Sequence, residues 1–69
     1  MKMTVREWRL VREISQKKAA AAVGVHVNTY AKWENEPGTI PIKKMYDLAA
    51  LFGVSIDNFI IDKTLQNVV

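Results

Sequence analysis

A single glycine, Gly24, divides the middle of the chain, the stretch Gln16 to Trp33, into two short segments of helical composition. Glycine has no Cβ atom and adopts positive φ without strain, so it can end a helix in a left-handed cap. Ala20 precedes it by four residues, where a methyl side chain suits two helices that cross closely. We expect two helices joined by a tight turn at Gly24, with the second helix running from about Val27 to Asn35.

The second helix has two sides of different character. The side that we expect to be buried carries Tyr30 and Trp33, and Val23 and Val25, which precede the helix, extend this side at matching spacings. The opposite side carries Val27, Asn28, Ala31 and Lys32. The helical spacing of the two aromatic residues indicates packing in the core rather than stacking on bases.

The exposed side of this helix matches the chemistry of base edges in the major groove of DNA. Asn28 and Lys32 are four residues apart and so project from one face. An amide can pair with adenine, a cation with guanine, and an apolar group such as Val27 with a thymine methyl. The sequence therefore predicts that Val27, Asn28 and Lys32 contact bases, although a surface helix of any function also exposes polar residues.

Further residues occur at matching spacings around this motif. They are Ser15, Gln16, Ala20, Gly24, Val25, Tyr30, Trp33, Glu34 and Asn35, followed by Leu48, Ala49 and the run from Leu51 to Ser55. Together they resemble the lambda-repressor/Cro-like, XRE-type helix-turn-helix family of bacterial and phage transcription regulators, from about Thr4 to Ile60. The resemblance implies an all-α fold: a compact five-helix lambda-repressor-like DNA-binding domain over residues 1–60, followed by a short C-terminal tail at 61–69.

The resemblance also implies roles for single residues. In this family the arginine at the position of Arg9 pairs with the glutamate that matches Glu34, and two solvated surface charges are the alternative. The glutamine that matches Gln16 contacts a DNA phosphate and braces the recognition helix, the second helix of the motif. The family usually has a glycine where this chain has Glu13. Either Glu13 adopts an unfavourable backbone conformation, or the first helix ends differently.

Other residues are expected to contact the DNA backbone. Lys17 lies in a first helical turn, where the helix dipole repels a cation, and a nearby phosphate would remove that penalty. A solvated lysine is the alternative. Thr29 and Asn35 are better placed for phosphates than for bases. Lys43 and Lys44 come early in the next helix and are expected to reach phosphate.

Capping residues predict where the helices begin and end. Thr4 and Glu7 form a capping-box pattern for a first helix from about Val5 to Arg12. Ser15 stands at the N-cap of the second helix. His26, the sole histidine, stands at the N-cap of the recognition helix. We expect it to be an exposed end residue, and a pH-dependent DNA contact through its protonated form is the alternative.

Two more helices are predicted after the recognition helix. One runs from about Pro41 to Phe52 and ends at Gly53, and a short fifth helix, capped by Ser55, runs from about Ile56 to Ile60. The buried faces of the first, fourth and fifth helices are expected to carry Val5, Trp8, Val11, Ile42, Met45, Leu48, Ala49, Phe52, Ile56 and Phe59.

Composition excludes several classes of protein. The 69 residues can form one domain, and the absence of cysteine excludes disulfides and thiolate metal sites. With one histidine and no glycine-rich phosphate loop, we predict no catalytic residues, no metal and no cofactor. The sequence lacks a membrane-spanning run and a signal peptide, which predicts a cytoplasmic protein without membrane contact. The formal net charge of +3 suits a polyanionic partner without requiring one.

The resulting prediction is a sequence-specific transcription regulator that binds double-stranded DNA. We expect a Cro-like repressor that binds a palindromic operator as a homodimer, with two recognition helices in successive major grooves about 34 Å apart. The alternative is an antitoxin-type interaction module that binds a toxin partner and represses its own operon. The apolar tail at 61–69 is expected either to fray or to form a strand or a dimer contact.

Overall fold

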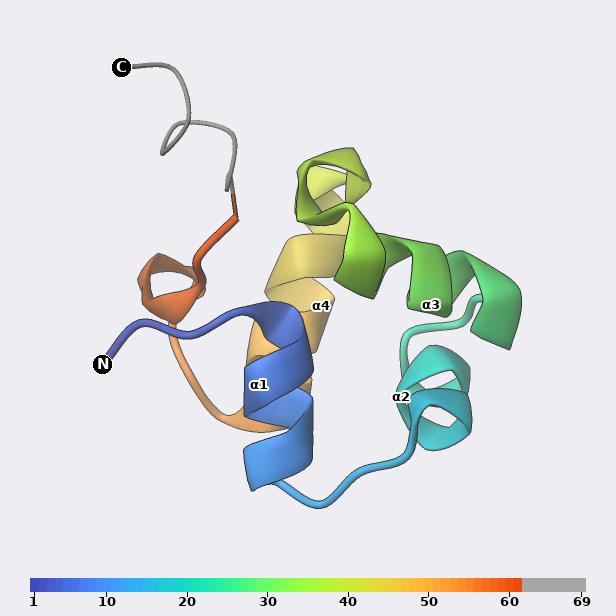
Figure 1. Cartoon of the computed structure of the whole chain (residues 1–69), viewed down its shortest axis with the longest axis horizontal. Helices are drawn as coiled ribbons and strands as arrows, with labels where there is room; N and C mark the ends of the chain where they lie inside the picture. Colours follow the sequence, from blue (N-terminus) through green and yellow to red (C-terminus); the bar gives the residue numbers. More distant parts are fainter. Residues whose placement is uncertain (62–69) are drawn as a thin grey trace.

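The computed structural model describes residues 1–61, which form a small all-helical fold (Figure 1). In chain order the helices are α1 (Val5–Val11), α2 (Gln16–Ala22), α3 (Val27–Asn35), the 3-10 helix η1 (Pro37–Thr39), α4 (Ile42–Phe52) and the 3-10 helix η2 (Ile56–Asn58). The all-α class is confirmed, and α3 has the predicted bounds. The count of five helices is wrong, because the described part of the chain contains four α-helices and two 3-10 turns.

The predicted fifth helix is a single 3-10 turn because the chain leaves it early. Ser55 caps the turn by accepting a hydrogen bond from Asp57 N, and Asn58 Oδ1 accepts one from Ser55 N. Phe59 then adopts an extended conformation and forms an isolated parallel bridge with Met3. Pairing with the N-terminal segment therefore replaces the next helical hydrogen bonds.

Three helices end in the same left-handed conformation. Gly24 follows α2 with a φ of 75°, and Gly53 follows α4 with a φ of 71°. Glu13 occupies the equivalent position after α1 with a φ of 56°. Ile14 N donates to Arg9 O, just as Val25 N donates to Ala20 O after α2. Glu13 thus adopts the conformation for which glycine is suited, the first of the two outcomes expected for it.

We expect Glu13→Gly to stabilise the domain by about 0.5–1 kcal/mol, because relief of the left-handed strain exceeds the entropy that glycine adds to the unfolded chain. The Glu13 side chain is exposed, so its packing contributes little. Chemical unfolding followed by tryptophan fluorescence measures the change. Glu13→Ala is the control, because alanine keeps the strain while removing the charge. An equal gain from Ala would show that the charge was the cause.

The core lies between the four α-helices. Its fully buried large side chains are Tyr30, Phe52, Leu48 and Val5. Edge-to-face ring pairs join Tyr30 to Trp33 and Phe52 to Phe59, so the aromatic residues of α3 are packing residues as predicted. Ala19 and Ala20 are buried on α2, and their small side chains let α2 pack closely against its neighbours.

Two residues predicted to be buried are exposed. Val11, the last residue of α1, is 54% exposed, and Ile42, the first residue of α4, is 64% exposed. The buried residues of α1 are Val5 and Trp8, one turn apart, and Val11 lies at the end of the helix, beyond the part that the core covers. Ile42 precedes the buried residues of α4, which begin at Met45, so the core covers only the later turns of that helix.

The N-terminal segment is attached to the segment that follows η2. Met3 N donates to Asn58 O at 3.0 Å, and Ile60 N donates to Met3 O at 2.9 Å. The indole Nε1 of Trp8 donates to the same Asn58 carbonyl at 2.9 Å. Ile61 packs against the core. The predicted role of the tail as a strand or dimer contact falls mainly on residues 62–69, which lie outside the described residues.

Candidate nucleic-acid interface

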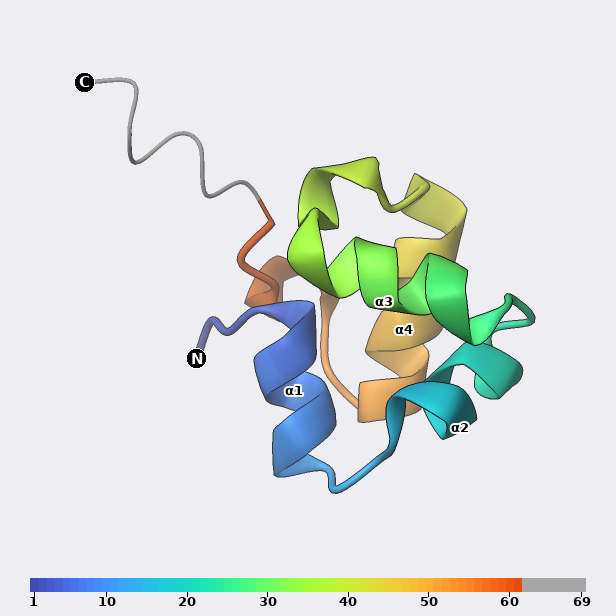
Figure 2. The same ribbon diagram turned by 45° about the vertical axis from the view of Figure 1, so that its right-hand side comes forward.

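The turn between α2 and α3 lies at one side of the molecule, with α4 behind α3 (Figure 2). Gly24 N donates to Ala21 O and Val25 N donates to Ala20 O, which closes the end of α2 before the chain enters α3. His26 caps α3: its Nδ1 accepts a hydrogen bond from Asn28 N at 3.0 Å. The imidazole is exposed, as expected, and its Nδ1 satisfies a backbone donor at the start of α3.

The two sides of α3 differ as the sequence predicted. Tyr30, Trp33 and Glu34 are buried, whereas Asn28 and Lys32 are exposed. Thr29 and Asn35, predicted phosphate contacts, are also exposed, and Val27 and Ala31 are half-buried. Val27 packs partly against the core, so only part of its side chain remains for a thymine methyl. The predicted base-contacting residues therefore lie together on α3, with Asn28 and Lys32 the most accessible of them.

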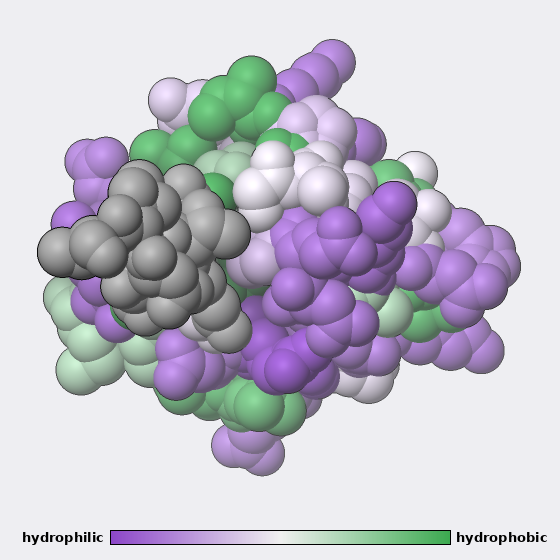
Figure 3. Space-filling model, turned by 45° about the horizontal axis from the view of Figure 1, so that its top comes forward, coloured by the Kyte–Doolittle hydropathy of each residue, from purple (hydrophilic) through white to green (hydrophobic). Residues whose placement is uncertain are grey.

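Hydrophilic residues dominate the neighbouring surface. Figure 3, which turns the top of Figure 1 toward the viewer, shows hydrophilic side chains over much of the centre and right of that face, with smaller apolar areas between them. Lys17 on α2 and Lys43 on α4 are exposed, as a phosphate contact requires. Lys44 is half-buried instead, and its Nζ donates to Val23 O at 2.7 Å. Adjacent lysines of α4 thus have different surroundings.

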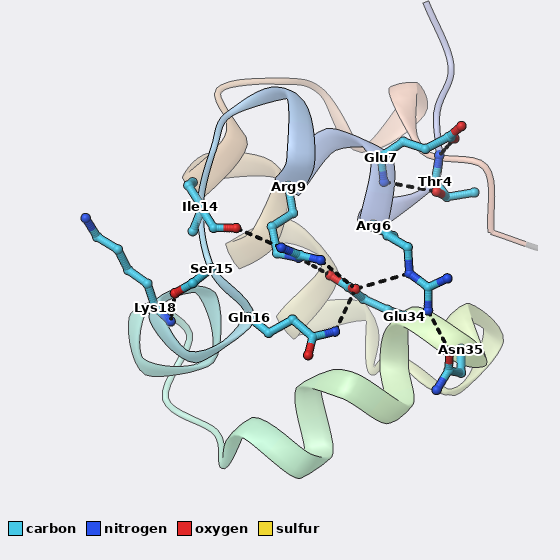
Figure 4. A network of polar contacts seen from close by, with 10 residues as sticks. All are labelled: Thr4, Arg6, Glu7, Arg9, Ile14, Ser15, Gln16, Lys18, Glu34 and Asn35. Carbon is cyan, nitrogen blue, oxygen red and sulfur yellow. Dashed lines mark hydrogen bonds and ion pairs between the residues drawn. The ribbon is translucent and has the colours of Figure 1, made fainter.

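A carboxylate at the end of α3 is the centre of a polar network (Figure 4). The Glu34 side chain is fully buried, and Arg9 Nε lies 2.6 Å from its Oε2. Arg9 Nη1 also donates to Ile14 O at 2.8 Å, so one guanidinium holds both α3 and the loop before α2. The Arg9–Glu34 pair implied by the family resemblance is confirmed.

Gln16 joins the same network from the start of α2. Its Nε2 donates to Glu34 Oε1 at 2.9 Å, which is the bracing contact expected for this glutamine. The phosphate contact expected of Gln16 stays a prediction, and its side chain remains half-exposed. Through this amide, the first turn of α2 is fixed to the last turn of α3.

Arg6 is a member of the network that sequence reasoning missed. Its Nε lies 3.4 Å from Glu34 Oε1, and its Nη2 donates to Asn35 Oδ1 at 2.6 Å. The signal was available, because Arg6 precedes Arg9 by three residues and so shares its helical face. By engaging the carbonyl oxygen of Asn35, Arg6 leaves the amide nitrogen of that side chain for another acceptor.

The network also sets the charge of its members. Burial alone would raise the pKa of the Glu34 carboxyl, but hydrogen bonds from Arg9 and Gln16 and the charge of Arg9 outweigh burial, so the pKa of Glu34 is lowered. Burial raises the pKa of Tyr30, whose hydroxyl lies near the same carboxylate. Within residues 1–61 this hydroxyl is buried without a hydrogen bond of acceptable geometry.

The lowered pKa predicts that acid destabilises the domain. A carboxyl whose pKa is lower in the folded state contributes stability above its unfolded pKa, near 4.5, and this contribution is lost as the pH falls through the folded pKa. We expect the free energy of unfolding to decrease below about pH 4.5. Denaturant titrations at pH 7, 5, 4 and 3 measure it. Glu34→Gln should be less stable at pH 7 and show a weaker acid dependence; an unchanged acid dependence would place the titrating group elsewhere.

Glu34 fixes α3 to α1 and α2, and a turn at Gly24 precedes α3, whose other side is exposed. This arrangement defines a helix-turn-helix DNA-binding protein. Residues 5–59 match the family model described as Helix-turn-helix, and the chain belongs to this family, the XRE-type, lambda-repressor/Cro-like regulators. The protein is a DNA-binding transcription regulator, of a family of regulators rather than enzymes. No curated protein and no solved structure matched the chain.

Among residues 1–61, no helix has the length and apolar character needed to cross a membrane. In the same residues, no cluster of three histidine, cysteine or acidic side chains is arranged to hold a metal ion.

Proposed function

We propose that the protein is a Cro-like repressor that binds a palindromic operator as a homodimer, with α3 in the major groove. The observation that carries this proposal is the contrast between the two sides of α3. The buried Glu34 holds one side against α1 and α2, while the side chains of Asn28 and Lys32 project from the other and form no hydrogen bond or ion pair with any described residue. A rigid helix that presents an amide and a cation suits direct recognition of base edges.

The contacts divide into two sets by chemistry and position. Val27, Asn28 and Lys32 contact bases. The phosphate contacts are Gln16, Lys17, Thr29, Asn35 and Lys43, which carry amide, hydroxyl or ammonium donors. The exposed lysines lie in the first turns of α2 and α4, and the Asn35 amide is oriented by Arg6. Phosphate contacts of this kind fix the orientation on the duplex, and base contacts select the sequence.

The small size of one binding unit supports a dimer. One copy presents a single α3, and short helix-turn-helix domains gain affinity by placing two such helices about 34 Å apart, one DNA turn. A dimer bound over a promoter would block polymerase by occupancy, with no chemical step. We place the protein in the cytoplasm, where such a site would be bound.

The test is repeated selection of duplexes from a random-sequence pool by the full chain at a fixed moderate salt concentration, followed by sequencing. A two-fold-symmetric consensus with half-sites about 10 base pairs apart is the expected result. The double variant Asn28→Ala, Lys32→Ala is the control and should lose the enrichment. A consensus without symmetry would contradict the homodimer, and no enrichment would contradict sequence-specific regulation.

One observation favours a second function, the antitoxin-type module that binds a protein partner. Four large apolar side chains of the helices are more than half exposed: Leu10, Val11, Ile42 and Tyr46. Ile42 and Tyr46 lie one turn apart on α4, and exposed apolar groups of this kind suit a protein contact. Purification of the tagged chain from its native cells, followed by mass spectrometry, separates the two functions, because a stoichiometric toxin should appear only under the second.

A further inference from the structure

Lys44 reaches from α4 to the turn of the helix-turn-helix motif. Its Nζ donates to Val23 O at 2.7 Å, and Val23 is the C-cap residue of α2. The same ammonium lies 3.8 Å from the point where a Cβ atom on Gly24 would stand, so it lies against the turn itself. Lys44 is half-buried, unlike its neighbour Lys43, which is exposed.

Lys44 supplies a positive charge that the carboxyl end of α2 lacks. The last turn of α2 contains no basic residue, so nothing within the helix balances the partial negative charge of its carboxyl end. Gly24 N and Val25 N already pair with the carbonyls of Ala21 and Ala20. The carbonyl of Val23, which leads directly into Gly24, is paired with the Lys44 ammonium instead. A cation supplied by another helix therefore completes the cap of α2.

We propose that Lys44 is a positioning residue for DNA binding, and that it acts by fixing the turn that aims α3 rather than by contacting a phosphate. The proposal rests on the proposed binding of DNA through α3. Its chemistry is that of a charge-assisted hydrogen bond to a backbone carbonyl, which is stronger than a neutral one. With that bond in place, a side chain of α4 fixes the turn from Val23 to His26, in addition to the backbone hydrogen bonds that close the end of α2. This role replaces the phosphate contact that the sequence predicted for Lys44.

The test compares three variants of the full chain: Lys44→Met, Lys43→Met and Arg12→Met. Lys43 is the matched control for charge, because it is the adjacent exposed lysine. Arg12 is the matched control for stability, because its Nε also completes a helix end, donating to Phe52 O at 2.8 Å at the end of α4. Binding to a duplex carrying the selected consensus is measured over a range of salt concentrations, well below the unfolding temperature of every variant.

We expect Lys44→Met to weaken binding about three- to tenfold with an unchanged salt dependence, because a positioning residue releases no counterions. Lys43→Met should make the slope of log affinity against log salt shallower by about 0.9 for each subunit, as the loss of one phosphate contact does. Arg12→Met should lower thermal stability and leave the affinity of the folded protein within twofold. Lys44→Met binding within twofold of the parent, or with a shallower slope, would overturn the proposal.

An independent readout needs no DNA. In amide spectra of the free protein, Lys44→Met should shift the signals of residues 23 to 28, and Arg12→Met should leave these signals in place. Unshifted signals in Lys44→Met would overturn the proposed role of Lys44, whatever the affinity. A parent protein that selects no DNA would instead contradict the proposed function, and the spectra would still decide whether Lys44 fixes the turn.

Discussion

Glu34→Ala is expected to lower the free energy of unfolding by about 3–5 kcal/mol, a large part of the stability of a small domain. The carboxylate is fully buried and lies within hydrogen-bond distance of Arg9, Gln16 and Arg6. Its removal leaves the Arg9 guanidinium, whose side chain is only 12% exposed, without the anion that compensates its burial. The loss therefore includes the cost of an unpaired buried charge as well as the four hydrogen bonds that Arg6, Arg9 and Gln16 donate to the carboxylate.

Denaturant unfolding at pH 7, followed by the fluorescence of the two tryptophans, measures this change. Glu36→Ala is the matched control, because Glu36 lies two residues further along the chain and is exposed. A surface substitution of that kind should change stability by no more than about 0.5 kcal/mol. If both variants lost the same small amount, the Glu34 network would be a set of contacts with little net effect on stability.

Asn28→Ala should weaken binding to the selected operator by about 1–3 kcal/mol for each half-site and relax discrimination at one base pair. The Asn28 side chain is exposed on α3, while its backbone N–H is paired with His26. Alanine keeps that backbone hydrogen bond, so the helix should persist and only the amide contact is lost. The measurement is binding to the consensus duplex and to duplexes changed at each position of the half-site.

Thr29→Ala is the matched control for Asn28→Ala. Thr29 is the next residue, also exposed, and is proposed to contact phosphate. Its replacement should weaken binding to every duplex by a similar factor, because phosphates carry little sequence information. The same uniform loss in Asn28→Ala would make Asn28 a phosphate contact and contradict its assignment to a base.

Local signals in the sequence predicted most of the helix ends. The Thr4–Glu7 capping box and the Ser15 cap are present as predicted, and Gly24 and Gly53 have the left-handed conformation expected of them. Each of these signals acts over a few residues, so the sequence around it contains the whole cause. The face of α3 that carries Asn28 was predictable for the same reason, because helical periodicity fixes which residues share a side.

Features that depend on distant parts of the chain were harder to predict from the sequence. The Arg9–Glu34 pair was expected only through the family resemblance, and the contribution of Arg6 to it was not anticipated. The link from Lys44 to Val23 joins residues 21 positions apart, and no periodicity reports which carbonyl a long side chain will reach. The expected burial of Ile42 was wrong because the sequence pattern of α4 shows an apolar stripe but does not show where the neighbouring helices stop covering it.

The Glu34 network has a consequence for how the protein meets its operator. Arg9, Arg6 and Gln16 all contact Glu34 near the end of α3. The helix therefore cannot rotate about its axis without breaking several hydrogen bonds to this carboxylate. The exposed side of α3 is thus preorganised, because the entropy of ordering this helix is lost during folding and not during association. Under the proposed binding through α3, discrimination between operators depends on the exposed side chains of that helix and on the shape of the DNA, which must adapt to the protein.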